Sequence, residues 1–144
     1  MSYRKPWQSY RQIATQTASP GQLVLMLFDG AIRFLEQARA GFNNDDPLEF
    51  NQSIHNNIVK AQAIINELNA SLDTEKGGEL AAKLRILYNY MDGRLHESNV
   101  KKEQAGILDV IRRVTVLRDS WQQMLQTLPA ADDPLAVPAS AGLA

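Results

Sequence analysis

The chain has 144 residues, with 15 basic and 16 acidic side chains, a formal net charge of −1 and no cysteine. This length suits one domain with a core of its own. The absence of cysteine excludes disulfides and thiolate metal sites and suits a reducing compartment, and the balanced charge gives no whole-chain footprint for nucleic acid or an anionic membrane.

The first 16 residues are mostly polar but carry Trp7, Tyr10 and Ile13 at a spacing of three. This spacing predicts a short amphipathic turn or helix that caps the rest of the domain. The segment lacks the apolar run of a signal peptide, and the longest uncharged apolar stretch, 23–28, is too short to span a bilayer. We therefore expect a soluble, cytoplasmic protein without membrane insertion.

A first helix is predicted from residue 20 to about residue 41. Ser19 followed three residues later by Gln22 fits a capping box, and Pro20 occupies the first helical position, where its missing N–H is not needed. Apolar residues then recur at spacings of three and four, which predicts one core face. That face consists of Leu23, Leu27, Ala31, Phe34, Leu35 and Ala38.

A second helix is predicted from Pro47 to about Leu72, because Asp46, Pro47 and Glu49 repeat the same kind of start signal. Its inward residues are Phe50, Ile54, Ile58, Ala61, Ile65, Leu68 and Leu72. A third helix is predicted from about residue 79 to near Asn99. Its inward residues are Leu80, Leu84, Leu87, Tyr88, Met91 and Leu95.

A fourth helix is predicted over about 104–128, with the most regular apolar stripe of the chain. The stripe consists of Ile107, Val110, Ile111, Val114, Leu117, Trp121, Met124 and Leu128. Residues 129–144 are rich in alanine and proline without a periodic apolar face, which predicts a mobile tail. The fold class is therefore all-α: an antiparallel up-down four-helix bundle over 17–128, with an N-terminal cap over 1–16 and the tail over 129–144.

Motifs for catalysis, cofactors and metals are missing from the sequence. A bundle metal site needs Glu three residues before His, but Gln52 precedes His55 and Gly93 precedes His96, so both histidines are interpreted as surface or groove residues. No nucleophile elbow, phosphate-binding loop or dinucleotide fingerprint occurs. Asp29, in the apolar stretch of the first helix, is expected to face water or to hydrogen-bond nearby. We predict a binding protein that is not an enzyme and holds no cofactor or metal.

Several large apolar residues point away from the core direction of their helices when each helix is turned by about 100° per residue. Single exposed hydrophobes are common and carry no message. Spread over all four predicted helices, they also fit a second apolar surface, on which amphipathic helices of a partner could lie. These residues are Met26, Ile32, Val59, Ile86, Tyr90, Leu108 and Val116.

The chain resembles the flagellin-specific export chaperones of bacterial flagella, the FliS family, from about Tyr10 to Trp121. The motifs are specific in combination and stand in the expected order: Thr17-Ala-Ser-Pro20, Leu27-Phe-Asp-Gly-Ala31, Ala61-Gln-Ala-Ile-Ile65, Leu72-Asp73, Gly77-Gly78-Glu79, Leu87-Tyr-Asn-Tyr-Met91 with Leu95 and Asn99, and Leu117 with Trp121. Departures from the family pattern are small: Asn89 replaces a common aspartate, Ser98 a common alanine and Phe28 a common tyrosine.

The resemblance implies a chaperone that binds the disordered C-terminal segment of flagellin in the cytoplasm, prevents its premature polymerisation and supports its delivery to the flagellar type III secretion apparatus. It also implies contacts with other flagellar export or regulatory proteins. By similarity, Tyr10 and Ile13 match positions that border or cover the client groove. Together with the seven outward apolar residues, they form the predicted partner-binding set.

The sequence is also compatible with two other classes of function. A helical adaptor or self-associating structural bundle could use the same exposed hydrophobes to form a homodimer. A ligand- or metal-binding bundle is the third class, disfavoured by the missing Glu-x-x-His spacing.

Overall fold

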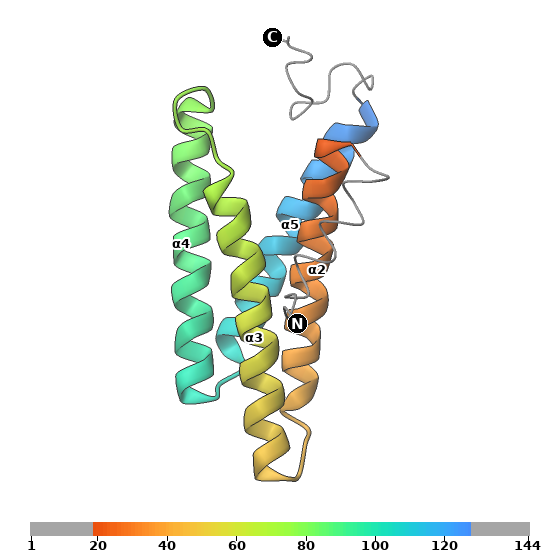
Figure 1. Ribbon diagram of the computed structural model, residues 1–144, viewed down its shortest axis with the longest axis vertical. Coiled ribbons are helices and arrows are strands. Elements are labelled where there is room, and N and C mark those ends of the chain that lie inside the picture. The colour runs from red at the N-terminus through yellow and green to blue at the C-terminus, as the bar shows by residue number, and fades with distance from the viewer. Residues whose placement is uncertain (1–18, 128–144) are drawn as a thin grey trace, which may run out of the picture.

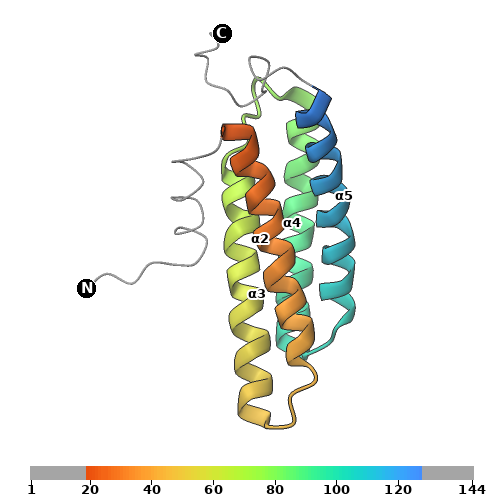
Figure 2. The same cartoon turned by 90° about the vertical axis from the view of Figure 1, so that its right-hand side faces the viewer.

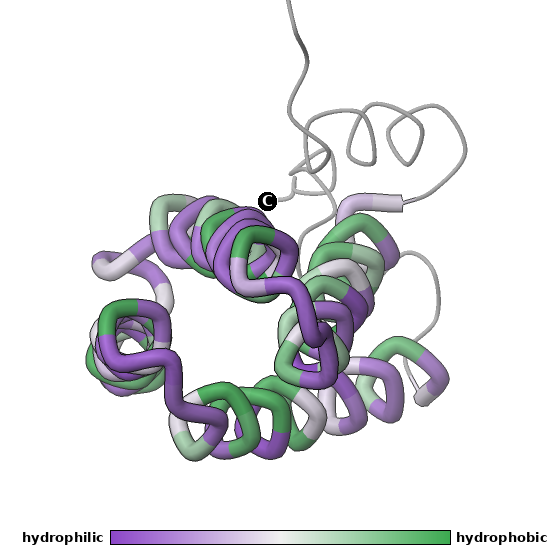
Figure 3. The backbone as a smooth tube through the Cα atoms, turned by 90° about the horizontal axis from the view of Figure 1, so that it is seen from below, coloured by the Kyte–Doolittle hydropathy of each residue, from purple (hydrophilic) through white to green (hydrophobic). Residues whose placement is uncertain are grey.

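The computed structural model describes residues 19–127 of the chain. Four helices make up the regular structure of this part: α2 (Pro20–Gly41), α3 (Pro47–Ala70), α4 (Gly78–Lys101) and α5 (Ala105–Thr127). They run alternately up and down (Figures 1 and 2). Each helix contacts the next along the chain and α2 also contacts α5, which closes the ring seen along the long axis in Figure 3. The predicted antiparallel four-helix bundle is confirmed, and the predicted cap and tail lie outside the described residues.

The first two helices begin at the predicted caps. The Ser19 hydroxyl oxygen accepts a hydrogen bond from the backbone N–H of Gln22 at 3.2 Å. The carboxylate of Asp46 accepts one from the N–H of Leu48 at 3.4 Å. Each of these bonds satisfies a backbone donor that the first turn of a helix leaves without a partner, so local chemistry sets both start positions.

The ends of the helices are less well predicted. Helix α4 continues two residues past Asn99, because Lys102 takes the left-handed conformation (φ 53°) that ends it. The Lys102 ammonium donates to the backbone oxygen of Asn99 at 2.8 Å, which satisfies a carbonyl of the last turn. Glycine usually fills this left-handed position, so a lysine there gives no stop signal in the sequence. Helix α3 ends at Ala70, two residues before the predicted Leu72.

The interior is apolar and receives side chains from all four helices. Leu35, Ile58, Ile65, Met91 and Val110 are completely buried within it. The wider core also contains Leu27, Phe28, Ala31, Phe34, Ala38, Ile54, Ala61, Ile64, Leu68, Tyr88, Leu95, Ile107 and Val114. The predicted core faces are therefore confirmed for most positions of all four helices. Leu23 and Met124 are half-buried at the ends of their faces, Leu128 lies outside the described residues, and one predicted core residue is exposed.

The exception is Leu80, which was predicted to point inward but is 67% exposed. The side-chain contacts of α4 with α5 include Tyr90 and Arg94 on Asp109, in the C-terminal half of α4. Leu80 lies in the first turn of α4, and Figure 1 shows α4 and α5 diverging from the 102–104 connection towards that end. The residue has the correct helical phase for the core but lies at the end of the bundle where α5 does not cover it.

Tyr88 is buried in the core, and this burial raises its pKa to about 12. In the unfolded chain the phenol titrates near pH 10, so above that pH the unfolded state loses its proton first. The free energy of unfolding therefore falls as pH rises. We expect it to be about 1.3 kcal/mol lower at pH 11 than at pH 9. Urea unfolding of the native chain and of Tyr88→Phe at both pH values measures it. An identical pH dependence in the two proteins would contradict the assignment.

Candidate partner-binding surface

The structure divides the predicted partner-binding residues into exposed and half-buried sets. Ile86 (70%), Val116 (65%) and Tyr90 and Val59 (43% each) are exposed. Met26, Ile32 and Leu108 are half-buried, and Ile32 packs against the core. Tyr10 and Ile13 lie outside the described residues, so their placement stays a prediction. The four exposed residues are the ones that a partner could contact without rearrangement of the bundle.

Sequence reasoning missed three further exposed hydrophobes, Leu48, Leu80 and Val100. Leu80 has the helical phase of a core residue, so the sequence pattern predicts burial at a position that is exposed. Val100 lay beyond the predicted end of the third helix. Leu48 lies in the first turn of α3 and, 11 positions before Val59, shares its helical face, so projection of the whole helix could have found it.

The exposed hydrophobes fall into two groups that lie towards opposite ends of the bundle. The first, which we call the α3–α4 patch, consists of Leu48, Val59 and Val100. It lies where the Asn99 amide and the His55 ring nitrogen are 2.9 Å apart and join α4 to α3. The second group, which we call the α4–α5 surface, consists of Leu80, Ile86, Tyr90 and Val116.

The residues of the α4–α5 surface are brought together by the antiparallel pairing of the two helices. Tyr90 on α4 meets Asp109 on α5 through a hydrogen bond of 2.7 Å from its hydroxyl to the carboxylate. From this contact, Ile86 lies one turn back along α4 and Val116 two turns forward along α5, so both lie towards the same end of the bundle. Leu80 lies further along α4 in the same direction.

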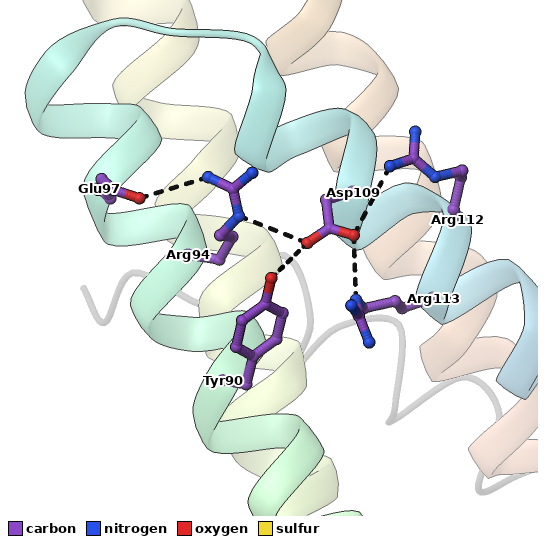
Figure 4. Close-up of polar contacts among 6 residues, drawn as sticks. All are labelled: Tyr90, Arg94, Glu97, Asp109, Arg112 and Arg113. Atoms are coloured by element: carbon purple, nitrogen blue, oxygen red, sulfur yellow. Dashed lines mark hydrogen bonds and ion pairs between the residues drawn. The ribbon is translucent and has the colours of Figure 1, made fainter.

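A polar cluster marks the edge of the α4–α5 surface that is nearest the 102–104 connection (Figure 4). Besides the Tyr90 hydroxyl, the Asp109 carboxylate accepts from the Arg113 Nε at 3.0 Å and lies 3.4 Å from the Arg94 Nε. The Arg113 guanidinium also stacks 4.7 Å from the centroid of the Tyr90 ring. The Tyr90 hydrogen bond, together with Arg113 and Arg94, holds the pKa of Asp109 below its usual range. Tyr90, which was predicted as a partner-contact residue, is therefore held in place by Asp109 and Arg113.

This cluster presents positive charge to solvent. The Asp109 side chain is only 14% exposed, whereas that of Arg112, at 3.7 Å from it, is 72% exposed. Asp109, Arg112, Arg113 and Val116 follow the i, i+3, i+4, i+7 spacing of one helical face. Three guanidinium groups thus cover one carboxylate directly beside an exposed valine. Such a surface suits an apolar partner segment that carries acidic side chains.

The opposite side of α5 is joined to α2 and serves the scaffold. The Arg118 Nε donates to the Asp29 carboxylate at 2.6 Å, and the indole N–H of Trp121 donates to the backbone oxygen of Gly21 at 2.7 Å. Asp29 was expected to face water or to bond nearby, but its partner lies 89 positions away on another helix. These bonds join α5 to α2. The side of α5 that carries Val116 is not used by them, so it is accessible to a partner.

Within residues 19–127, no group of three or more histidine, aspartate or glutamate side chains is arranged to hold a metal ion. Both histidines are exposed, as predicted, and His55 contacts Asn99. None of the four described helices combines the length and apolar character that a membrane span requires.

Comparison with known proteins shows the family of this chain. The sequence model of the family described as "Flagellar protein FliS" matches residues 3–128. The chain is 37% identical to the flagellar secretion chaperone FliS of Bacillus subtilis, over 88% of this chain and 91% of the relative. It is 36% identical to the protein of the same name from Salmonella typhimurium, over 81% and 87%, and 34% identical to that of Escherichia coli, over 91% and 97%. The chain belongs to the FliS family of flagellar proteins.

Proposed function

We propose that this protein binds the disordered C-terminal segment of flagellin in the cytoplasm, prevents its premature polymerisation and supports its delivery to the flagellar type III secretion apparatus. Membership of the FliS family supports the coarser part, a chaperone role in flagellar export. The observation that carries the finer part is the α4–α5 surface. Its exposed apolar side chains are not needed for the interior of the bundle, which is already filled by residues from all four helices.

A disordered client suits this surface for a physical reason. An unfolded segment loses conformational entropy when it binds, so it must collect many modest contacts to compensate. Apolar residues spread along α4 and α5 offer such contacts over several helical turns, whereas a small ligand would need one enclosed pocket. An amphipathic helix with apolar residues at i, i+3, i+4 and i+7 fits this geometry. Contacts with other flagellar export or regulatory proteins are part of the same proposal.

Calorimetric titration with the C-terminal segment of flagellin from the same organism tests the proposal. Saturable binding with a negative heat-capacity change is expected, because the interaction buries apolar surface. A segment of the same composition in scrambled order is the control and should bind more weakly. No detectable binding of the native segment would overturn the proposed function.

The N-terminal segment 7–13 is proposed to cover part of the client surface until the client displaces it. The proposal rests on the family resemblance at Tyr10 and Ile13 and on their apolar character. Hydrogen exchange of this segment, measured with and without the flagellin segment, should show faster exchange in the complex. Unchanged exchange rates would contradict displacement.

Self-association is an alternative use of the exposed hydrophobes. The α3–α4 patch favours this alternative, because a patch separate from the α4–α5 surface could bind a second copy of the chain while the client is bound. Light scattering of the isolated protein across a range of concentrations measures the oligomeric state. A dimer that Val59→Asp dissociates without loss of flagellin binding would assign this patch to self-association and leave the α4–α5 surface to the client.

A further inference from the structure

We propose that residues 128–144 of this chain bind to the α4–α5 surface of the same molecule and compete there with the client. The competition rests on the proposed function, whereas the intramolecular contact does not. The argument uses the exposure of the surface, its charge, the reach of the following residues and their composition.

The α4–α5 surface is unoccupied by the described part of the chain. Leu80, Ile86 and Val116 are each about two-thirds exposed, although they stand on helices whose other faces are well packed. Figure 1 shows α4 and α5 diverging towards the end where α4 begins and α5 stops. An occupant attached at that end would start beside the surface that it covers.

Residues 128–144 are attached there, because they follow Thr127 at the end of α5. Val116 lies 11 positions before Thr127, about 16 Å back along the helix axis. Leu135 lies eight positions after Thr127, and an extended chain covers about 3.3 Å per residue, so it can reach about 26 Å. The segment is therefore long enough to return along α5 as far as Val116 and Ile86.

The composition of the segment complements the surface. It contains Asp132 and Asp133 but no lysine or arginine, and its apolar residues include Leu135 and Val137. The surface offers exposed apolar side chains beside the Arg112 and Arg113 guanidinium groups. Three prolines at 129, 134 and 138 disfavour a helix, so the docked segment would be extended. The family match ends at residue 128, so residues 129–144 lie outside the matched region.

A nitroxide label tests the contact directly, because the cysteine-free chain accepts a single label at Ala136→Cys. We expect the label to broaden the amide resonances of α4 and α5 around Ile86 and Val116 but not those around Val59. Asp132→Lys/Asp133→Lys should remove at least half of this broadening. The same broadening in the native and charge-reversed chains would reflect tethering alone and would overturn the proposal, as would no broadening near Val116.

Titration of the flagellin C-terminal segment into the full chain tests the competition. Charge reversal at Asp132 and Asp133 should lower the apparent Kd severalfold, because a surface that is free for a larger fraction of the time binds more tightly. Asp45→Lys/Glu49→Lys is the matched control, since it changes net charge equally at the α2–α3 end. Equal affinity of the native and the charge-reversed chain would overturn competition. If neither chain binds the segment, the proposed function fails while the nitroxide result still decides the contact.

Discussion

Ile86→Asp/Val116→Asp should weaken binding of the flagellin C-terminal segment by at least about tenfold, which corresponds to about 1.4 kcal/mol of binding free energy. Both side chains are mostly exposed in the isolated protein, so aspartate there removes little packing. In the complex, the carboxylate at position 86 would be buried against apolar groups of the client, which is strongly unfavourable. The carboxylate at position 116 would lose water in the same way and would also neutralise the neighbouring Arg112 and Arg113 guanidinium groups. Calorimetry gives the affinity and circular dichroism checks that helicity is retained.

The matched control for this variant is Leu48→Asp/Val100→Asp, which places the same two carboxylates on the α3–α4 patch, at equally exposed positions outside the predicted partner-binding set. Its flagellin affinity should remain within about twofold of the native value. Equal losses in both variants would show that the α4–α5 surface is not the specific client site. Leu108 is unsuitable for this test, although it was predicted as a contact residue, because it is half-buried and aspartate there would also destabilise the bundle.

Gly106→Val is expected to lower the free energy of unfolding by about 3 kcal/mol or more, since overpacking at rigid sites reaches this range. Gly106 lies in the first turn of α5, directly against the backbone of α4. A Cβ atom at this position would lie 2.8 Å from the backbone oxygen of Arg94 and would overlap the Ser98 hydroxyl oxygen. The backbone oxygen cannot rotate away, so α4 and α5 would have to separate. Urea denaturation of the purified variant measures the loss.

Gly93→Ala is the control, because a Cβ atom there meets no other atom within 4 Å. In a helix interior this change should stabilise the protein by about 0.5–1 kcal/mol. Ser98→Ala combined with Gly106→Ala should be less destabilising than expected from the two single changes, because the overlap with the hydroxyl is removed. If Gly106→Val were as stable as the native chain, the close approach of α4 and α5 would be wrong.

Local chemistry explains which parts of the fold were predictable. Ser19, Asp46 and the prolines that follow them fix two helix starts, because a cap needs only neighbours within three residues. The core faces follow equally from the periodicity of each helix. The end of α4 did not follow, because its stop depends on a left-handed Lys102, a conformation that lysine rarely adopts.

The candidate site was predicted in part. Ile86, Tyr90 and Val116 were found by helical phase alone, and the structure leaves all three exposed. Phase could not reveal that the Tyr90 hydroxyl meets Asp109 on α5 or that Arg113 covers the Tyr90 ring, because these contacts join residues on different helices. It also misplaced Leu80, since a helical phase defines a direction but does not say whether a neighbouring helix is present there.

The sequence by itself therefore determined the helical class, the helix starts, the inward faces and the family resemblance, all of which depend on residues close together in the chain. Only the tertiary structure decided which outward hydrophobes stay uncovered, how they group into the α4–α5 surface and the α3–α4 patch, and that Asp29 bonds to Arg118. The physical reason is that exposure and long-range pairing depend on how far each helix extends beside its neighbours. That overlap is set by the packing of all four helices together.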